Sequence, residues 1–171
     1  MRYHTLTTDL IQQAGQQARY LGHSYVGSAH FLLALIQQPG MAGQLLRGMG
    51  MDHPLTWQMT AVLYGSGTPD LPLPQGLTRA ARRILRQAAS EARNFASRQI
   101  DPVHILLAMA RQERTASCEL LAFFSDIQQV ITLVHFLIDA GKLASAADAK
   151  QNVSCFQFID DVMNVFWCVL L

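Results

Sequence analysis

The chain has 171 residues, of which 50% are hydrophobic and 15% are charged, and its formal net charge is +1 at pH 7. This length allows one domain with an appendage, and the hydrophobic content excludes a disordered tail. A net charge near zero supplies no field for steering nucleic acid, so no nucleic-acid partner is expected.

The first predicted element is an amphipathic helix from Thr5 to Leu21. Apolar residues recur at helical spacing, and glutamines occupy the other face; the apolar positions are Leu10, Ile11, Ala14, Ala18 and Leu21. Thr7, Thr8 or Asp9 could cap its start, and the pattern does not distinguish among them. Gly22 follows at the position where a glycine ends a helix with positive φ.

Three shorter helices are predicted next. One runs from about Ser28 to Gln37 and ends before a Pro-Gly pair, with a core stripe of Phe31, Leu32, Leu35 and Ile36. Another extends from Ala42 to about Arg47, with Leu45, Leu46 and Met49 directed inward. The last runs from Leu55 to Leu63 after a cap at Asp52, and its apolar residues are Trp57, Met59, Val62 and Leu63.

The second half of the chain repeats the first at an offset of 74 residues. Tyr25–Leu35 matches Gln99–Met109, and the match extends upstream without a gap. The predicted helices of this copy begin after Leu77-Thr78, after Asp101 at Pro102–Arg111, at Ala116, and at Asp126 to about Leu137. Repetition at a fixed period indicates a repeat architecture. We therefore predict an all-α fold of two tandem four-helix repeats packed as a pseudo-twofold pair.

The boundaries follow from composition. Residues 1–63 form the first repeat, and residues 64–76 form a linker with three glycines and three prolines. Residues 77–137 form the second repeat. Residues 138–171 are a divergent apolar tail, which we do not expect to span a membrane because Asp160-Asp161 interrupts it. The tail is interpreted as a terminal helix packed on the domain, a partner-binding segment, or a foreign end produced by truncation or a frameshift. All eleven arginines lie between Arg2 and Arg114, whereas both lysines come later, and this change of composition favours the third interpretation.

The duplicated motif resembles the Clp N-terminal (Clp R) repeat domain of the Clp/Hsp100 AAA+ ATPases of ClpC and ClpA type. In this sequence the motif reads Ala18-Arg19-Tyr-Leu-Gly-His23-Ser-Tyr-Val-Gly-Ser-Ala-His30-Phe-Leu-Leu-Ala-Leu35. The resemblance covers about Tyr3 to Leu137. It implies a cytoplasmic docking module that receives adaptor proteins and protein substrates and passes them to a Clp ATPase ring or Clp protease complex. It implies no catalytic residue, no metal and no cofactor in the module itself.

The sequence departs from the family at the residues that would hold a ligand. A glutamate that precedes the motif histidine, and helps to bind phosphorylated arginine in the ClpC type, is replaced by Ala29 and Val103. The threonine that partners this glutamate corresponds to His4 and Thr78, so Thr78 is the one substrate- or adaptor-binding residue that the resemblance carries over. A guanidinium needs a carboxylate for bidentate hydrogen bonds. Whether phosphoarginine is bound therefore stays open at both sites.

The sequence contains no G-x-x-x-x-G-K-[ST] motif, so no ATP site is predicted in it. The resemblance and the missing ATP-binding motif leave two functional hypotheses. In the first, the chain is the N-terminal docking fragment of a Clp ATPase regulatory subunit. In the second, it is a stand-alone accessory protein of Clp-repeat fold that regulates the Clp complex.

Other polar residues have structural interpretations first. His30 and His104 each stand in the first turn of a helix without a carboxylate or cysteine at ligand spacing, which favours capping or core roles over metal binding. His23 follows a helix-ending glycine, where a cation would favour the helix dipole. Nothing in the spacing supplies a base for Ser90, Ser117 or Cys118, so no catalysis is predicted. Four arginines form one helical face, either solvated or in contact with an acidic adaptor: Arg79, Arg82, Arg83 and Arg86.

Overall fold

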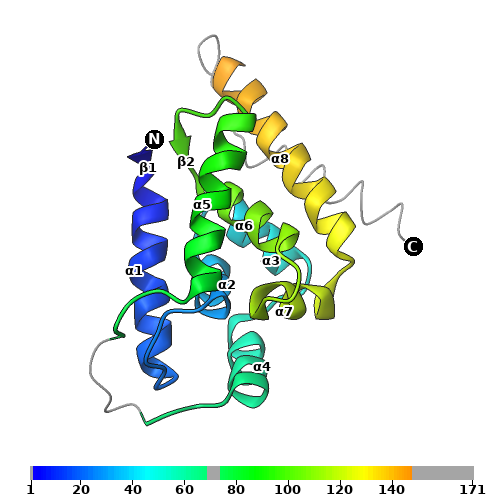
Figure 1. Ribbon diagram of the computed structural model, residues 1–171. Coiled ribbons are helices and arrows are strands. Elements are labelled where there is room, and N and C mark those ends of the chain that lie inside the picture. The colour runs from blue at the N-terminus through cyan, green and yellow to red at the C-terminus, as the bar shows by residue number, and fades with distance from the viewer. Residues whose placement is uncertain (1, 69–73, 148–171) are drawn as a thin grey trace. The chain divides into compact units, whose positions relative to one another are not determined.

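The computed structural model describes residues 2–68 and 74–147 as eight helices and two short strands (Figure 1). The first repeat contains β1 (Arg2–Tyr3), α1 (Thr5–Tyr20), α2 (Ser28–Gln37), α3 (Met41–Gly48) and α4 (His53–Tyr64). The second contains α5 (Arg79–Asn94), β2 (Gln99–Ile100), α6 (Pro102–Arg111), α7 (Ala116–Phe124) and α8 (Ile127–Ala147). The predicted all-α tandem-repeat fold is confirmed. The described residues up to Val134 form one compact unit, and a second unit starts at His135, within α8.

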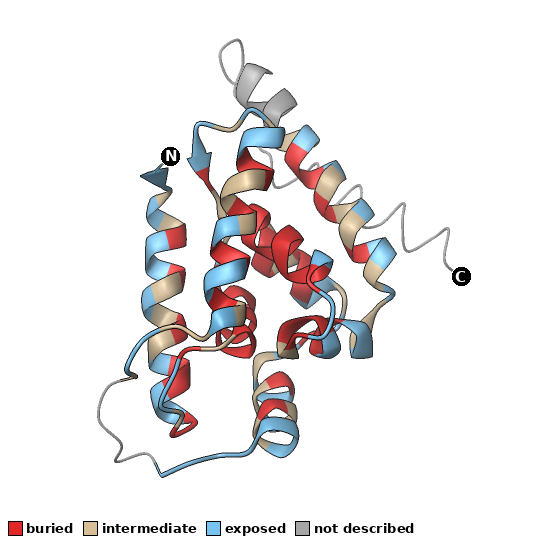
Figure 2. Ribbon diagram, in the orientation of Figure 1, coloured by how far each residue is buried: buried red, intermediate tan, exposed pale blue. Residues whose placement is uncertain are grey.

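The two motif helices form the core of the first unit. α2 packs against α1, and α6 packs against α5, while α2 also contacts α5, α6 and α7. Every residue of α2 from Ser28 to Ile36 is buried, as is every residue of α6 except its last (Figure 2). A helix that is apolar on all sides must lie inside a protein. The predicted core stripe of α2 comprises only Phe31, Leu32, Leu35 and Ile36, so burial extends further around this helix than predicted.

Two parallel backbone contacts join the repeats, and the sequence analysis did not predict either. β1 pairs with β2 in the register Arg2 to Gln99 and Tyr3 to Ile100. Val26 forms an isolated parallel bridge with Leu77. Each contact places the segment that leads into the first helix of one repeat beside the motif loop of the other repeat. This reciprocal arrangement is the physical form of the predicted pseudo-twofold pair.

α1 starts at Thr5, as predicted, but none of the three predicted caps is its N-cap. The N-cap is His4, whose Nδ1 accepts a hydrogen bond from the Leu6 backbone N–H at 3.2 Å. Thr7 is buried, and its hydroxyl donates to the Ile100 carbonyl at 2.6 Å. The predicted caps Thr7, Thr8 and Asp9 therefore lie inside the helix. The Thr7 hydroxyl is used in a contact with the second repeat, which local sequence does not encode.

One core assignment was only partly right. Met49, predicted to be directed inward from α3, is half-buried, whereas Met51 beyond α3 is fully buried. In α4 the buried positions are Thr56 and Thr60, whose hydroxyls donate to carbonyl groups one turn earlier in the chain. The apolar residues Trp57 and Met59 of this helix are half-buried, and its large exposed residues are Leu55, Val62, Leu63 and Tyr64.

The last described helix, α8, continues to Ala147, ten residues beyond its predicted end near Leu137. Its first residues are capped by Asp126, whose carboxylate accepts from the Gln128 N–H at 2.6 Å. Residues 148–171, which hold most of the predicted tail, lie outside the described part of the chain. The division into four segments stays a prediction.

Membrane-spanning helices were sought in residues 2–68 and 74–147. No single helix there is long and apolar enough to cross a membrane. α7 and Ile127–Gly141 meet the length and composition criteria only together, as a pair bent by 94°. The buried residues of α7 show that part of this apolar surface belongs to the protein core.

Candidate functional site

Thr78 lies where the second repeat meets the first. It is the N-cap of α5, and its hydroxyl oxygen accepts from the Ala81 N–H at 3.1 Å. Its own N–H donates to the Val26 carbonyl at 2.9 Å, so the cap is held against the loop that leads into α2. The structure therefore places Thr78 beside Ala29, in the same pocket, and not beside Val103 of its own repeat.

The reciprocal half-site contains His4 and the second motif. The His4 N–H donates to the Ile100 carbonyl at 3.1 Å, just as Thr78 is held by Val26. His4 and Thr78, which the sequence offset makes equivalent positions, are thus both N-caps, a role that was not predicted for them. Val103 is buried at the start of α6 and does not line the pocket that contains Thr78.

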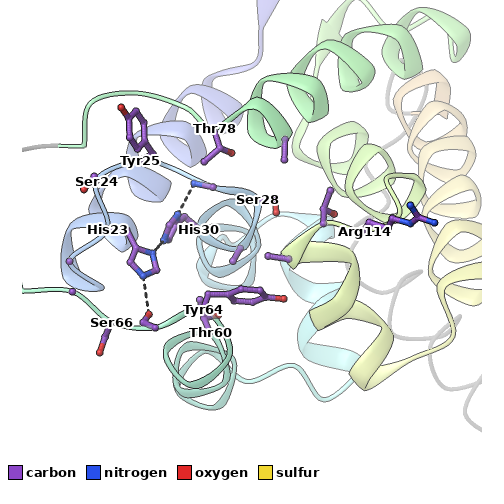
Figure 3. A pocket seen from close by; sticks show the side chains of 18 residues that line it. His23, Ser24, Tyr25, Ser28, His30, Thr60, Tyr64, Ser66, Thr78 and Arg114 are labelled. Carbon is purple, nitrogen blue, oxygen red and sulfur yellow. Dashed lines mark hydrogen bonds between the residues drawn. The ribbon is translucent and has the colours of Figure 1, made fainter.

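The pocket has a volume of about 650 Å³ and lies at the junction of the repeats (Figure 3). It is lined at the first turns of three helices, by Ser28 and Ala29 of α2, Ala80 of α5 and Ala116 of α7. Backbone N–H groups in a first helical turn have no partner within the helix, and they give this end a partial positive charge. The pocket is thus lined by potential hydrogen-bond donors from both repeats.

No aspartate or glutamate is among the described residues that line this pocket. Its one charged residue is Arg114, which has a positive φ of 57° immediately before the N-cap of α7. Figure 3 shows the Arg114 guanidinium at the edge of the residues that line the pocket, directed away from His23 and His30. The described lining therefore carries no negative charge and is rich in hydroxyl groups, which does not suit a guanidinium ligand.

Two histidines form a hydrogen-bonded chain along one wall (Figure 3). The Gly27 N–H donates to His30 Nδ1 at 2.8 Å, so the proton of that ring must be on Nε2. His30 Nε2 lies 2.8 Å from His23 Nδ1, and His23 Nε2 lies 2.9 Å from the Gly65 carbonyl oxygen. Each ring thus donates from Nε2 and accepts at Nδ1. These hydrogen bonds between the two histidines and the backbone connect the start of α2 to the segment that follows α4.

The second repeat shows how much of this arrangement is general. The Asp101 N–H donates to His104 Nδ1 at 3.0 Å, which matches the bond between Gly27 and His30. The predicted capping and core roles of His30 and His104 are therefore confirmed. Ser97 stands at the position equivalent to His23 and donates instead to the Gln99 carbonyl. His23 has a role the prediction missed: it connects His30 to Gly65.

Burial and the neighbouring His23 ring together lower the pKa of His30 to about 4. Burial is the larger cause, because removing an imidazolium from water disfavours its charged form. Protonation of His30 would also replace the acceptor at Nδ1 with a donor that faces the Gly27 N–H. The side chain is therefore held neutral near pH 7 and maintains the wall of the pocket.

A close approach of two glycines forms the rim. The Gly67 N–H donates to the Leu21 carbonyl at 2.8 Å. A Cβ atom on Gly22 would come within 2.3 Å of the Gly67 backbone, and one on Gly67 would come within 2.1 Å of the Gly22 carbonyl oxygen. Gly22 has a φ of +67°, as predicted for a residue that ends a helix. The segment after α4 can pack here only because both residues lack side chains.

Two further hydroxyl groups of the wall have structural partners. Ser28 Oγ accepts from the Ser117 N–H at 3.2 Å and so joins α2 to α7. The Tyr64 hydroxyl donates to the Glu119 carboxylate at 2.6 Å. Burial, together with the hydrogen bond and charge of Glu119, raises the pKa of Tyr64, which keeps the hydroxyl protonated. These contacts join α2 and α4 to α7 at the wall of the pocket.

The contacts of His23, His30 and Cys118 bear on nucleophilic and metal chemistry. The hydrogen bonds of His23 and His30 run to each other and to backbone groups rather than to a serine hydroxyl. Cys118 is buried, and burial followed by the charges of Glu113 and Glu119 raises its pKa, which opposes a reactive thiolate. In residues 2–68 and 74–147, no group of three His, Cys, Asp or Glu side chains is placed to hold a metal ion.

Comparison with known proteins identifies the architecture. The family model of the Clp repeat (R) N-terminal domain matches residues 2–122 and, in an overlapping second match, residues 76–155. An ATP-dependent Clp protease ATP-binding subunit ClpA homolog from Guillardia theta is 27% identical over 153 residues, which are 88% of this chain and 19% of that protein. The chloroplastic chaperone protein ClpC1 of Oryza sativa subsp. japonica is 28% identical over 121 residues, 70% of this chain and 13% of that protein.

Solved structures have the same fold. The N-terminal domain of the caseinolytic protease-associated chaperone ClpD from Arabidopsis thaliana aligns with a TM-score of 0.65 and 16% identity, covering 81% of this chain and 95% of that one. The N-terminal domain of the ClpV1 ATPase from E. coli aligns with a TM-score of 0.60 and 22% identity, covering 81% and 86%. The present chain spans less than a fifth of the curated relatives described above. The duplicated helices, their reciprocal pairing and the family match together show that the chain belongs to the Clp repeat (R) N-terminal domain family.

Proposed function

We propose that the chain is a docking module that receives protein substrates or adaptor proteins for an ATP-dependent Clp protease or chaperone. The similarity to the N-terminal parts of Clp ATP-binding subunits supports this role. These 171 residues contain no G-x-x-x-x-G-K-[ST] motif, and the proposed docking role requires none.

The observation that carries the proposal is the pocket between the repeats. Its volume of about 650 Å³ is enough for a few side chains of a polypeptide. Backbone N–H groups and hydroxyls around it suit the carbonyl groups of a peptide, and the exposed ring of Tyr25 provides an apolar contact at its edge. Such a surface binds polypeptide without requiring one particular side chain.

The chemistry of the pocket also restricts the class of side chain that can bind in it. Ala29 lies where a carboxylate would be needed to hold a guanidinium, and no other acid lines the wall. We infer that the pocket does not select arginine or phosphoarginine. A segment presenting carbonyl groups or a neutral side chain fits it better.

A binding experiment with matched tryptophan variants tests this role. Peptides from an unfolded model protein that bind the 171-residue chain on an array would be measured in solution by fluorescence anisotropy. Ser66 is an exposed residue on the pocket wall, whereas Thr68, two residues later and also exposed, does not line it. We expect Ser66→Trp to weaken binding about tenfold by filling the pocket, and Thr68→Trp to leave it unchanged. Absence of any binding peptide, or equal affinity in both variants, would contradict the proposal.

A further inference from the structure

The exposed face of α5 carries a cluster of arginines that the pocket does not use. We call this the basic face of α5 and define it as Arg79, Arg82, Arg83 and Arg86. All four side chains are exposed, and their spacing of three and four residues places them on one side of the helix. None of them lines the pocket between the repeats.

These arginines work against the stability of their own helix. Arg79 and Arg82 lie in the first turn, where the helix dipole favours acidic residues, and this turn contains no acid. Like charges three and four residues apart also repel one another. The one acidic residue of α5, Glu91, is buried and pairs with Arg111 at 2.6 Å, so it does not offset this repulsion.

The internal repeat provides a control for what the fold requires. With the offset of 74 residues, the positions of the basic face correspond in α1 to Thr5, Thr8, Asp9 and Gln12. α1 and α5 are both 16 residues long, and each packs against its motif helix. The same helix thus forms in this fold without a single cation at these positions. The arginines are therefore not needed for folding.

A hollow adjoins the basic face. It has a volume of about 340 Å³ and is lined by Tyr3, Arg82, Leu85, Arg86 and Ala89. Tyr3 is 42% exposed, and Leu85 and Ala89 add apolar surface between the two cations. Arg83 donates to Gln112 at 3.0 Å. By contrast, Arg82 and Arg86 take part neither in the His104–Asp101 ion pair nor in the Arg111–Glu91 ion pair.

We propose that the basic face of α5 and this hollow form a second docking surface for an acidic polypeptide segment. Carboxylates of the segment would pair with Arg82 and Arg86, and an apolar or aromatic side chain between them would pack against Tyr3 and Leu85. Charge complementarity at the rim and an apolar centre are the ordinary composition of a protein interface. A polypeptide fits better than nucleic acid, because the net charge of the chain is only +1.

The test uses a fluorescent peptide in which glutamates flank a single phenylalanine, and a matched peptide with glutamines in their place. Arg82→Thr combined with Arg86→Gln gives α5 the residues that α1 already has. The control combines Arg19→Gln with Arg93→Gln, which removes the same charge from the last turns of α1 and α5. We expect the first double variant to weaken binding of the acidic peptide about tenfold, and the control to change it less than twofold.

Four further measurements make the result decisive. The glutamine peptide should not bind, and Ser66→Trp should leave binding of the acidic peptide unchanged, which separates this surface from the pocket. The melting temperature of Arg82→Thr with Arg86→Gln should equal or exceed that of the wild type, because repulsion is removed. The proposal is overturned by equal losses in both double variants, by a lowered melting temperature in the first, or by an oligothymidylate of equal charge that binds as tightly as the peptide.

Discussion

The residues of the pocket differ in how far their positions could be foreseen. The offset between the copies correctly pairs Thr78 with His4, but it did not show that both residues are N-caps. His23 is also visible in the sequence, since its counterpart in the second copy is Ser97, but its bond to His30 depends on a fold that brings three segments together. Arg114 and Ala116 carry no signal, because the loop before α7 and the first residue of α7 contribute them from the other repeat.

The buried His30 predicts a dependence of stability on pH. Its pKa is about 4 in the folded protein and about 6.5 in an unfolded chain. The unfolded state therefore takes up a proton between pH 6.5 and pH 4, while the folded state does not. Stability from this residue is present above pH 6.5 and is lost as the pH falls through that window, by about 3 kcal/mol in total.

Urea unfolding at pH 7.5 and pH 5 measures this effect. His30→Asn keeps an acceptor for the Gly27 N–H and does not titrate, so its stability should fall less between the two pH values than that of the wild type, by about 2 kcal/mol. Comparing the change in unfolding free energy with pH between the two proteins cancels the contribution of other titrating groups. One of these is His53, whose pKa is lowered by burial, an effect that the charge of Asp52 partly opposes. Parallel slopes in the two proteins would refute the assignment to His30.

At the scale of elements, the periodic pattern located the helices but not their contacts. α6 spans Pro102–Arg111 as predicted, because Asp101 and Pro102 provide strong local signals for its start. α4 was correctly placed, yet its buried side is formed by Thr56 and Thr60. A threonine hydroxyl can donate to a backbone carbonyl one turn earlier, so threonine can be buried without another polar partner. The hydrophobic pattern of the sequence therefore does not reveal that these threonines are buried. The strands are two residues long, too short to produce an alternating pattern.

The contact between α1 and the segment after α4 predicts an asymmetry between two glycines with positive φ. Gly22→Ala would introduce both an unfavourable φ and an overlap with the Gly67 backbone, whereas Gly50→Ala, at a φ of +82°, meets no atom within 4 Å. Ala96 tolerates a φ of 54° at the position equivalent to Gly22, so conformation alone is a small cost. We expect Gly50→Ala to lower the free energy of unfolding by about 1 kcal/mol, and Gly22→Ala by about 3 kcal/mol.

Chemical denaturation of both variants checks this expectation. An equal loss of stability in Gly22→Ala and Gly50→Ala would show that the close approach does not hold the rim of the pocket. A second alanine at Gly67, added to Gly22→Ala, should cost less than the sum of the two single changes, because both remove the same contact.

At the scale of the whole molecule, the duplication determines the site. The internal offset of 74 residues was enough to predict two repeats in pseudo-twofold arrangement, and the family match agrees. The crossed pairing of β1 with β2 and of Val26 with Leu77 was not predictable, since no local pattern specifies which repeat a segment contacts. That crossing carries Thr78 to Ala29 and forms the pocket from both halves of the chain.

The central claim is that a polypeptide docks at this junction of the repeats. A ¹H–¹⁵N NMR titration of the 171-residue chain with an array-selected peptide tests it most directly. We predict that the largest shift changes occur at the amides of Ser28, Ala29, Ala80 and Ala116, which line the pocket from both repeats. Changes confined to one repeat, or centred on α3 away from the pocket, would contradict the account.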